Sequence, residues 1–139
     1  MSARTKARKR ALDALYAAGV RQDDALLLLK ETNDEVADRQ NQDAIFDYAE
    51  MLLMGYFTNA DQIDNELKML ADGWSLERMP NVDRAILRLG AWEILHNEEV
   101  PNEVAIAEAV ALASEYSTDD SPKFINGVLA RLAKGGAAL

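Results

Sequence analysis

The stretch "NVDRAILRLGAWEILH" (residues 81–96) is the most informative part of this sequence, because its apolar residues cover nearly every side of a helix. A helix that is apolar all round is buried by its neighbours, so we expect residues 81–96 to form the central helix of the molecule. Gly90 lies inside this helix and costs about 1 kcal/mol relative to alanine. We therefore expect another helix to cross close to the backbone at Gly90.

The segments on either side repeat their apolar residues at the same helical period, and β-branched residues are scarce, which predicts an all-α protein. Before the central helix we expect a first helix through Leu12, Leu15 and Ala18 or Gly19, a short helix over 25–31 capped by Asp23 or Asp24, a polar loop over 32–43, and a long helix over 45–70 bent at Gly55 or Asn59. Around and after it we expect a helical turn capped by Ser75, Pro80 in the first turn of the central helix, a helix over 102–116, and a last helix with Ser121 as cap and Pro122 in its first position.

The charge of the chain is unevenly distributed. The 139 residues suit a single domain, with 24 acidic against 15 basic residues and a net charge of −9. The first ten residues carry +5 and residues 11–139 carry −14, so a basic arm (1–10) precedes an acidic body, and residues 134–139 form a flexible tail. There is no cysteine and no apolar run of the ~20 residues that span a bilayer. We expect a cytoplasmic protein in a reducing compartment.

Most enzyme classes lack their necessary residues in this sequence. Its one histidine, His96, falls in the last turn of the central helix, where it complements the helix dipole and has no nucleophile to activate. No glycine-rich phosphate-binding loop occurs. The acidic pairs sit at helix boundaries, where capping explains them. We expect no catalysis, no cofactor and no metal site.

The basic arm suggests nucleic-acid binding. It contains Arg4, Lys6, Arg8, Lys9 and Arg10, which surround the axis of the first helix, so we expect its first turns to project beyond the body. Tyr16 lies two turns from Lys9 on one strip of surface, and an aromatic ring beside an ammonium group suits single-stranded RNA. The alternative is a solvated arm that only neutralises the acidic body.

A second aromatic residue strengthens the RNA interpretation. Phe124 falls in the first turn of the last helix beside Lys123, near backbone amides that favour phosphate. From the residues alone, a core position for the ring of Phe124 is an equal alternative.

Three segments together resemble the NusB family of transcription antitermination factors: "RKRALDALY" near the start, "VDRAILRLGAWEI" in the middle, and "VPNEVAIAEAVALASEYSTDDSPKFINGVLARL" near the end. The resemblance implies a compact helical bundle of about seven helices in two packed subdomains, without catalysis. It also implies binding of the boxA segment of nascent ribosomal RNA together with the ribosomal protein NusE, and assembly of an antitermination complex on RNA polymerase.

The resemblance assigns roles to individual residues. The RNA-binding residues it implies are Arg4, Lys6, Arg8, Lys9, Arg10, Tyr16, Asp120, Lys123 and Phe124. Asp83 is implied to face NusE. Two positions depart from the family pattern: Ala107 stands where asparagine is frequent, and Thr5 where an arginine occurs.

Other interpretations of the sequence stay open. A NusB-like domain also precedes the catalytic part of some ribosomal RNA cytosine methyltransferases, and here only that accessory module would be present. A protein-binding helical module whose basic arm meets an acidic partner is a third reading. The apolar stripes fit a monomer and a homodimer equally well, and a dimer through the first helix would mask the RNA surface.

Overall fold

The computed structural model describes residues 2–35, 41–71 and 75–135. The helices in these ranges are α1 (Ala3–Arg21), α2 (Ala25–Glu35), α3 (Gln42–Thr58), α4 (Ala60–Leu70), the 3-10 turn η1 (Leu76–Arg78), α5 (Asn81–His96), α6 (Asn102–Tyr116) and α7 (Ser121–Ala133). No strand occurs in the described ranges, which confirms the all-α prediction.

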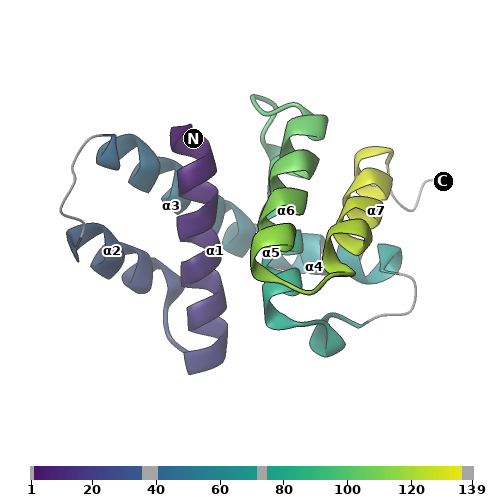
Figure 1. Ribbon diagram of the computed structural model, residues 1–139, viewed down its shortest axis with the longest axis horizontal. Helices are drawn as coiled ribbons and strands as arrows, with labels where there is room; N and C mark the ends of the chain where they lie inside the picture. Colours follow the sequence, from purple (N-terminus) through teal and green to yellow (C-terminus); the bar gives the residue numbers. More distant parts are fainter. Residues whose placement is uncertain (1, 36–40, 72–74, 136–139) are drawn as a thin grey trace.

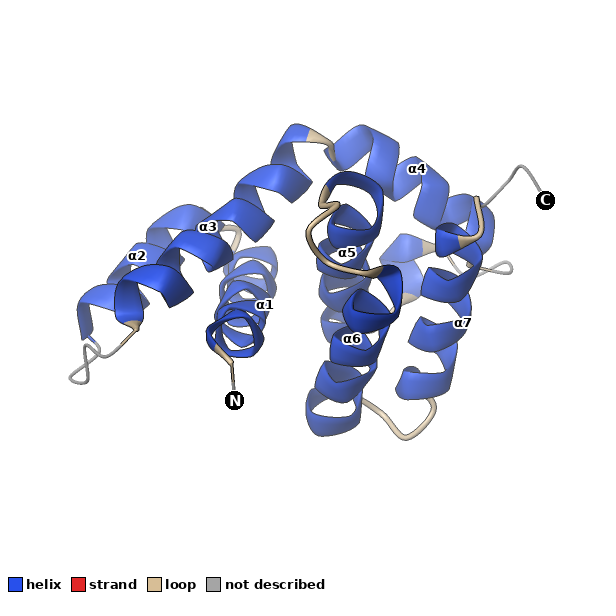
Figure 2. Cartoon of the chain, turned by 90° about the horizontal axis from the view of Figure 1, so that it is seen from above, coloured by secondary structure: helices blue, strands red, loops and turns tan. Residues whose placement is uncertain are grey.

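The helices form two packed groups, α1–α3 and α4–α7 (Figure 1). α5 contacts α1 and α3 of the first group and α4, α6 and α7 of the second, so the predicted central helix is confirmed. α1 lies between the α2–α3 pair and α5 (Figure 2). It therefore forms the seam between the two groups. None of the helices in the described ranges is both long and apolar enough to cross a bilayer.

Two glycines of the interior mark close approaches between helices. A Cβ atom built on Gly90 would lie 2.9 Å from Cδ1 of Leu129 in α7 and 3.6 Å from Cβ of Ala109 in α6. The expected close crossing at Gly90 is therefore confirmed. A Cβ atom on Gly55 in α3 would lie only 2.2 Å from the indole ring of Trp92 in α5. Gly55 thus lets the two helix groups meet.

We expect Gly55→Ala to lower the free energy of unfolding by about 1–3 kcal/mol, because the rigid indole ring of Trp92 cannot yield to the added methyl group. Gly127→Ala in α7 is the matched control. A Cβ at Gly127 meets no atom within 4 Å, so this change should raise stability by about 0.5–1 kcal/mol through helix propensity. Urea denaturation of both variants measures the difference, and equal effects would contradict the close α3–α5 contact.

Several helix boundaries differ from the predicted ones. The long helix expected over 45–70 is two helices, because Asn59 ends α3 and its side-chain Nδ2 donates to the Gly55 carbonyl at 2.8 Å. α2 extends to Glu35 into the predicted loop, of which residues 36–40 lie outside the described ranges. Asp24 precedes α2 and accepts from the Leu26 amide at 2.9 Å, as expected. The predicted tail also lies largely outside the described residues, at 136–139.

The proline and serine positions need two further corrections. Pro80 is the residue before α5, one position earlier than predicted. Asp120, not Ser121, occupies the cap position of α7, which shifts Pro122 to the second helical position. The Ser121 hydroxyl is instead turned inward, where it has a buried partner on α5.

Candidate nucleic-acid interface

The basic arm does not project from the body. α1 begins at Ala3, its first turn is capped by the Ser2 hydroxyl, which accepts from the Thr5 amide at 3.1 Å, and Ala7 and Ala11 are fully buried. The Thr5 hydroxyl also donates to Glu108 of α6 at 2.6 Å. The prediction of projecting turns was therefore wrong, because acidic side chains of other helices accept the cations that face inward.

Arg8 shows this most clearly. Arg8 is only 5% exposed, and its side chain forms a bidentate ion pair with Glu93 of α5, with Nε–Oε1 and Nη2–Oε2 distances of 2.9 Å. Glu108 of α6 lies 3.3 Å from Nη1. Burial alone would lower the pKa of Arg8, but its hydrogen bonds and charge contact with Glu93 outweigh burial and raise that pKa. Arg8 is thus a permanent cation whose charge is already neutralised inside the protein.

Tyr48 of α3 completes this buried network. Its hydroxyl donates to Glu93 and accepts from Asn97 Nδ2 at 3.1 Å. Burial, followed by the hydrogen bond to Glu93, raises the pKa of Tyr48, so the hydroxyl keeps its proton and remains a donor. The network joins α1, α3, α5 and α6 across the seam. As placed, Arg8 cannot contact a phosphate, which corrects its predicted role.

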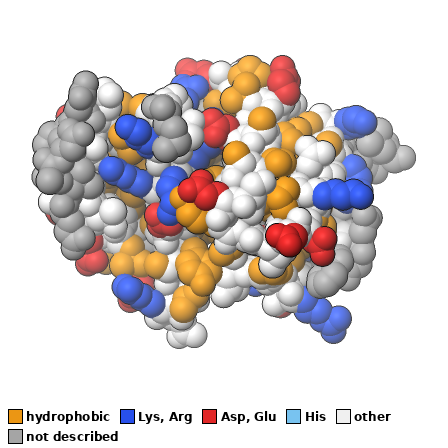
Figure 3. Space-filling view, in the orientation of Figure 1, with side chains coloured by type: hydrophobic (Ala, Val, Ile, Leu, Met, Phe, Trp, Pro, Cys, Tyr) orange, Lys and Arg blue, Asp and Glu red, His pale blue; other side chains and the backbone are white. Residues whose placement is uncertain are grey.

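The other cations of α1 lie nearer the surface, where Lys and Arg side chains gather over the N-terminal half of α1 (Figure 3). Arg4 pairs with Glu99 at 3.0 Å, Lys9 pairs with Asp13, and Arg10 donates to Gln42 at 2.6 Å. Lys6 is exposed and makes no ion pair with any described residue. Four of the five predicted cations are therefore placed where phosphate could reach them.

The expected pairing of Lys9 with Tyr16 is not found. The ammonium of Lys9 lies 4.2 Å from the ring centroid of Tyr116, an exposed residue at the end of α6. Tyr16 is also exposed, but it lines a small hollow against the first turns of α5, with Gly19 and Arg84 among its neighbours. Sequence reasoning missed Tyr116. Its signal was an aromatic residue in the last turn of a helix that is otherwise rich in alanine.

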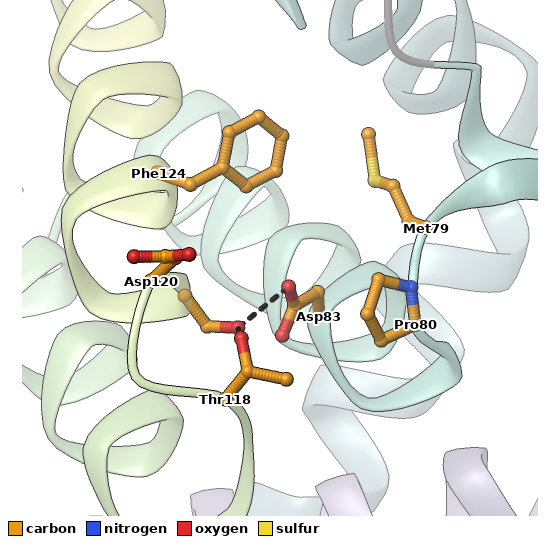
Figure 4. Close-up of a pocket in the computed structure, with 7 residues that line it drawn as sticks. Met79, Pro80, Asp83, Thr118, Asp120 and Phe124 are labelled. Carbon is orange, nitrogen blue, oxygen red and sulfur yellow. Dashed lines mark hydrogen bonds between the residues drawn. The ribbon is translucent and has the colours of Figure 1, made fainter.

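A pocket of about 290 Å³ lies at the start of α7 (Figure 4). It is lined by Met79, Pro80, Asp83, Thr118, Asp120, Ser121 and Phe124. The ring of Phe124 faces the pocket opposite Met79 and also packs against the core. The packing contact is confirmed, and base stacking stays a prediction. Lys123 and Asp120 are exposed beside it. An apolar pocket with polar groups at its rim suits a flat, heterocyclic ligand group.

Asp83 is largely buried by its hydrogen-bond partners. It is 4% exposed, and its two carboxylate oxygens accept from the hydroxyls of Ser117 and Ser121, the latter at 2.8 Å. It therefore ties the first turn of α5 to the start of α7. Little of its carboxylate is accessible, although Asp83 also lines the pocket at the start of α7, and its contact with a partner protein stays a prediction.

A series of contacts links the two clusters predicted from sequence. Lys9 of α1 contacts the ring of Tyr116. The next residue, Ser117, forms hydrogen bonds with Asp83 and, at 3.0 Å, with Ser121. Phe124 lies one turn further along α7. The helices that carry these residues, α1, α6 and α7, follow one another from left to right in Figure 1. We call the strip formed by Arg4, Lys6, Lys9, Tyr116, Lys123 and Phe124 the α1–α7 face.

The remaining candidate groups have structural roles. Nε2 of His96 lies 2.8 Å from Gln62 Oε1 and links α5 to α4. No group of three or more His, Cys, Asp or Glu side chains in the part of the chain described is placed to hold a metal ion. Ala107, one of the two departures from the family pattern, is exposed on α6.

Comparison with known proteins agrees with the resemblance seen in the sequence. The NusB family model matches residues 5–134. A transcription antitermination protein NusB from Leifsonia xyli subsp. xyli is 49% identical over 134 residues, which cover 96% of this chain and 93% of that protein. T. maritima NusB superposes with a TM-score of 0.86 at 35% identity, over 96% of this chain and 92% of that one.

A solved structure of the antitermination factors NusB and NusE in complex with double-stranded RNA superposes with a TM-score of 0.83 at 26% identity, over 97% of this chain and 98% of that one. The relatives are named transcription antitermination proteins, which is a regulatory role and not an enzymatic one, and this agrees with the expectation of no catalysis. On the family match and on near-half identity over almost its whole length, this chain belongs to the NusB family.

Proposed function

We propose that this chain binds the boxA segment of nascent ribosomal RNA transcripts together with NusE, in the cytoplasm, and helps assemble the antitermination complex on RNA polymerase. The observation that carries the proposal is the α1–α7 face, which places exposed cations next to two accessible aromatic rings on a body of otherwise negative charge. Cations follow the phosphate backbone of a single strand, while aromatic rings stack on its bases.

Each part of the α1–α7 face would take one part of the RNA. Arg4, Lys6 and Lys9 are proposed to bind phosphates, with Arg10 and Lys123 at the two ends. Tyr116 and Phe124 would stack on bases, and Tyr16 would extend the strip along α1. The exposed carboxylate of Asp120 at the rim of the pocket would accept hydrogen bonds from base amino groups.

The proposal is tested by the salt dependence of RNA binding. If about four cations meet phosphates of a single strand, log K plotted against log salt should fall with a slope of about −3. Fluorescence anisotropy with a labelled boxA-type oligonucleotide measures this slope. A slope near zero would favour the alternative, a helical module that binds only proteins.

The same titration with and without saturating NusE tests joint recognition. A basic ribosomal protein bound to the acidic body would cancel part of its repulsion of RNA and add phosphate contacts of its own. We expect RNA and NusE to increase each other's binding free energy by about 1–3 kcal/mol, by the same amount whichever is added first. Identical RNA affinity in both titrations would mean two independent sites. Asp83→Lys is unsuitable for this test, since it would break the link from α5 to α7.

A further inference from the structure

Two cations of the α1–α7 face are held in the same way, each by an acid and an aromatic ring. Arg4 pairs with Glu99 at 3.0 Å, and its guanidinium lies 4.9 Å from the ring centroid of Tyr48. Lys9 pairs with Asp13, and its ammonium lies 4.2 Å from the ring centroid of Tyr116. Two of the cations that RNA phosphates would meet are thus already neutralised by carboxylates of the same chain.

We infer that Glu99 and Asp13 compete with RNA phosphates for Arg4 and Lys9, and so set the RNA affinity of the α1–α7 face. The inference rests on the proposed function. A carboxylate and a phosphate are both anionic acceptors for the same N–H donors, so a phosphate can bind Arg4 or Lys9 fully only after the carboxylate has left. RNA that gains base stacking as well would overcome this competition, and a bare polyanion would do so less readily.

Exposure separates these two ion pairs from the buried one. The side chains of Glu99 and Asp13 are 77% and 60% exposed. Water can therefore hydrate each carboxylate when a phosphate binds its partner cation. Glu93 is only 2% exposed, so water could not hydrate its carboxylate if Arg8 left. The rings of Tyr48 and Tyr116 would hold Arg4 and Lys9 in position after the acids have gone. Removal of either acid should therefore free a cation without disordering it.

The chain offers matched controls. Glu98 is the neighbour of Glu99, is exposed, and makes no ion pair with any residue in the described ranges; Asp23, just after α1, is likewise exposed and unpaired within those ranges. Glu99→Gln and Glu98→Gln remove the same charge from adjacent positions. Asp13→Asn and Asp23→Asn form a second pair near α1. Any difference within a pair reports the ion pair and not the net charge.

The experiment measures affinity for the labelled boxA-type oligonucleotide at low and high salt. We expect Glu99→Gln and Asp13→Asn each to raise affinity about two- to fivefold above their controls, with an unchanged salt slope, because a directly competing partner is lost. Equal affinities of the variants and their controls would overturn the inference. Lys6→Ala tests the proposed function separately. If the chain binds RNA and Lys6→Ala does not weaken that binding, the α1–α7 face is not the RNA-binding surface and the proposed function is wrong on this point. If Lys6→Ala weakens binding and the paired acids behave like their controls, only the inference fails.

Discussion

Glu93→Ala is expected to lower the free energy of unfolding by about 3–5 kcal/mol, the cost of leaving a buried charge without its partner. Arg8 is enclosed by α5 and α6, and Glu93 accepts both of its short hydrogen bonds and that of Tyr48. Without Glu93, the acidic partner left to Arg8 among the described residues is Glu108, at the longer distance of 3.3 Å. Urea denaturation followed by far-UV circular dichroism measures the loss.

Two further variants make the Glu93 result specific. Glu98→Ala removes an exposed acid from the turn after α5 and should change stability by less than about 0.5 kcal/mol. The double variant Arg8→Met with Glu93→Leu removes both charges and should recover part of the stability, because apolar pairs of similar volume replace buried ion pairs well. The recovery is incomplete because the Tyr48 hydroxyl loses its acceptor. A loss below about 1 kcal/mol in Glu93→Ala would mean that Arg8 is solvated and free to bind RNA.

Phe124→Ala is expected to weaken RNA binding by about 1–3 kcal/mol, or roughly 5- to 150-fold, if a base stacks on its ring in the pocket at the start of α7. Phe57→Ala is the matched control, since Phe57 is an exposed ring on α3, far along the chain from the α1–α7 face. The control should bind RNA like the unchanged chain.

Because Phe124 also packs against the core, stability must be measured beside affinity. Affinity per folded molecule is the quantity to compare at a temperature where both variants are folded. A fall in melting temperature with unchanged RNA affinity would show that the ring of Phe124 serves packing alone, and that the pocket takes no base.

The sequence predicted the central helix because its apolar pattern is local information. Residues 81–96 are covered on nearly every side, and this alone requires surrounding helices. The position of Gly90 within this helix likewise predicted a close helix crossing. It did not indicate that Leu129 would be the residue opposite. The sequence offered Gly55 and Asn59 as positions for a bend in the long helix. In the structure α3 ends at Asn59, whose side chain donates a hydrogen bond to the Gly55 carbonyl.

The errors concern charged residues whose partners lie far away in the chain. Arg8 and Glu93 are separated by 85 positions, so nothing near Arg8 indicates that a carboxylate will neutralise it inside the protein. The burial of Asp83 could not be predicted for the same reason, because its partner Ser121 lies 38 positions away. A charged residue is read as exposed by default, and only the tertiary arrangement reveals a buried ion pair. Tyr116 was missed because its importance depends on Lys9, a residue of another helix.

We propose that single-stranded RNA binds along the α1–α7 face. The most direct test is amide chemical-shift mapping by NMR, in which the ¹⁵N-labelled chain is titrated with a boxA-type oligonucleotide, a method that also detects weak binding. The claim predicts the largest shift changes over residues 4–10 and 116–124, with little change at Met51, Met54 and Phe57 on the outer side of α3. Shift changes centred on α2, α3 or α4, with residues 116–124 unaffected, would contradict it.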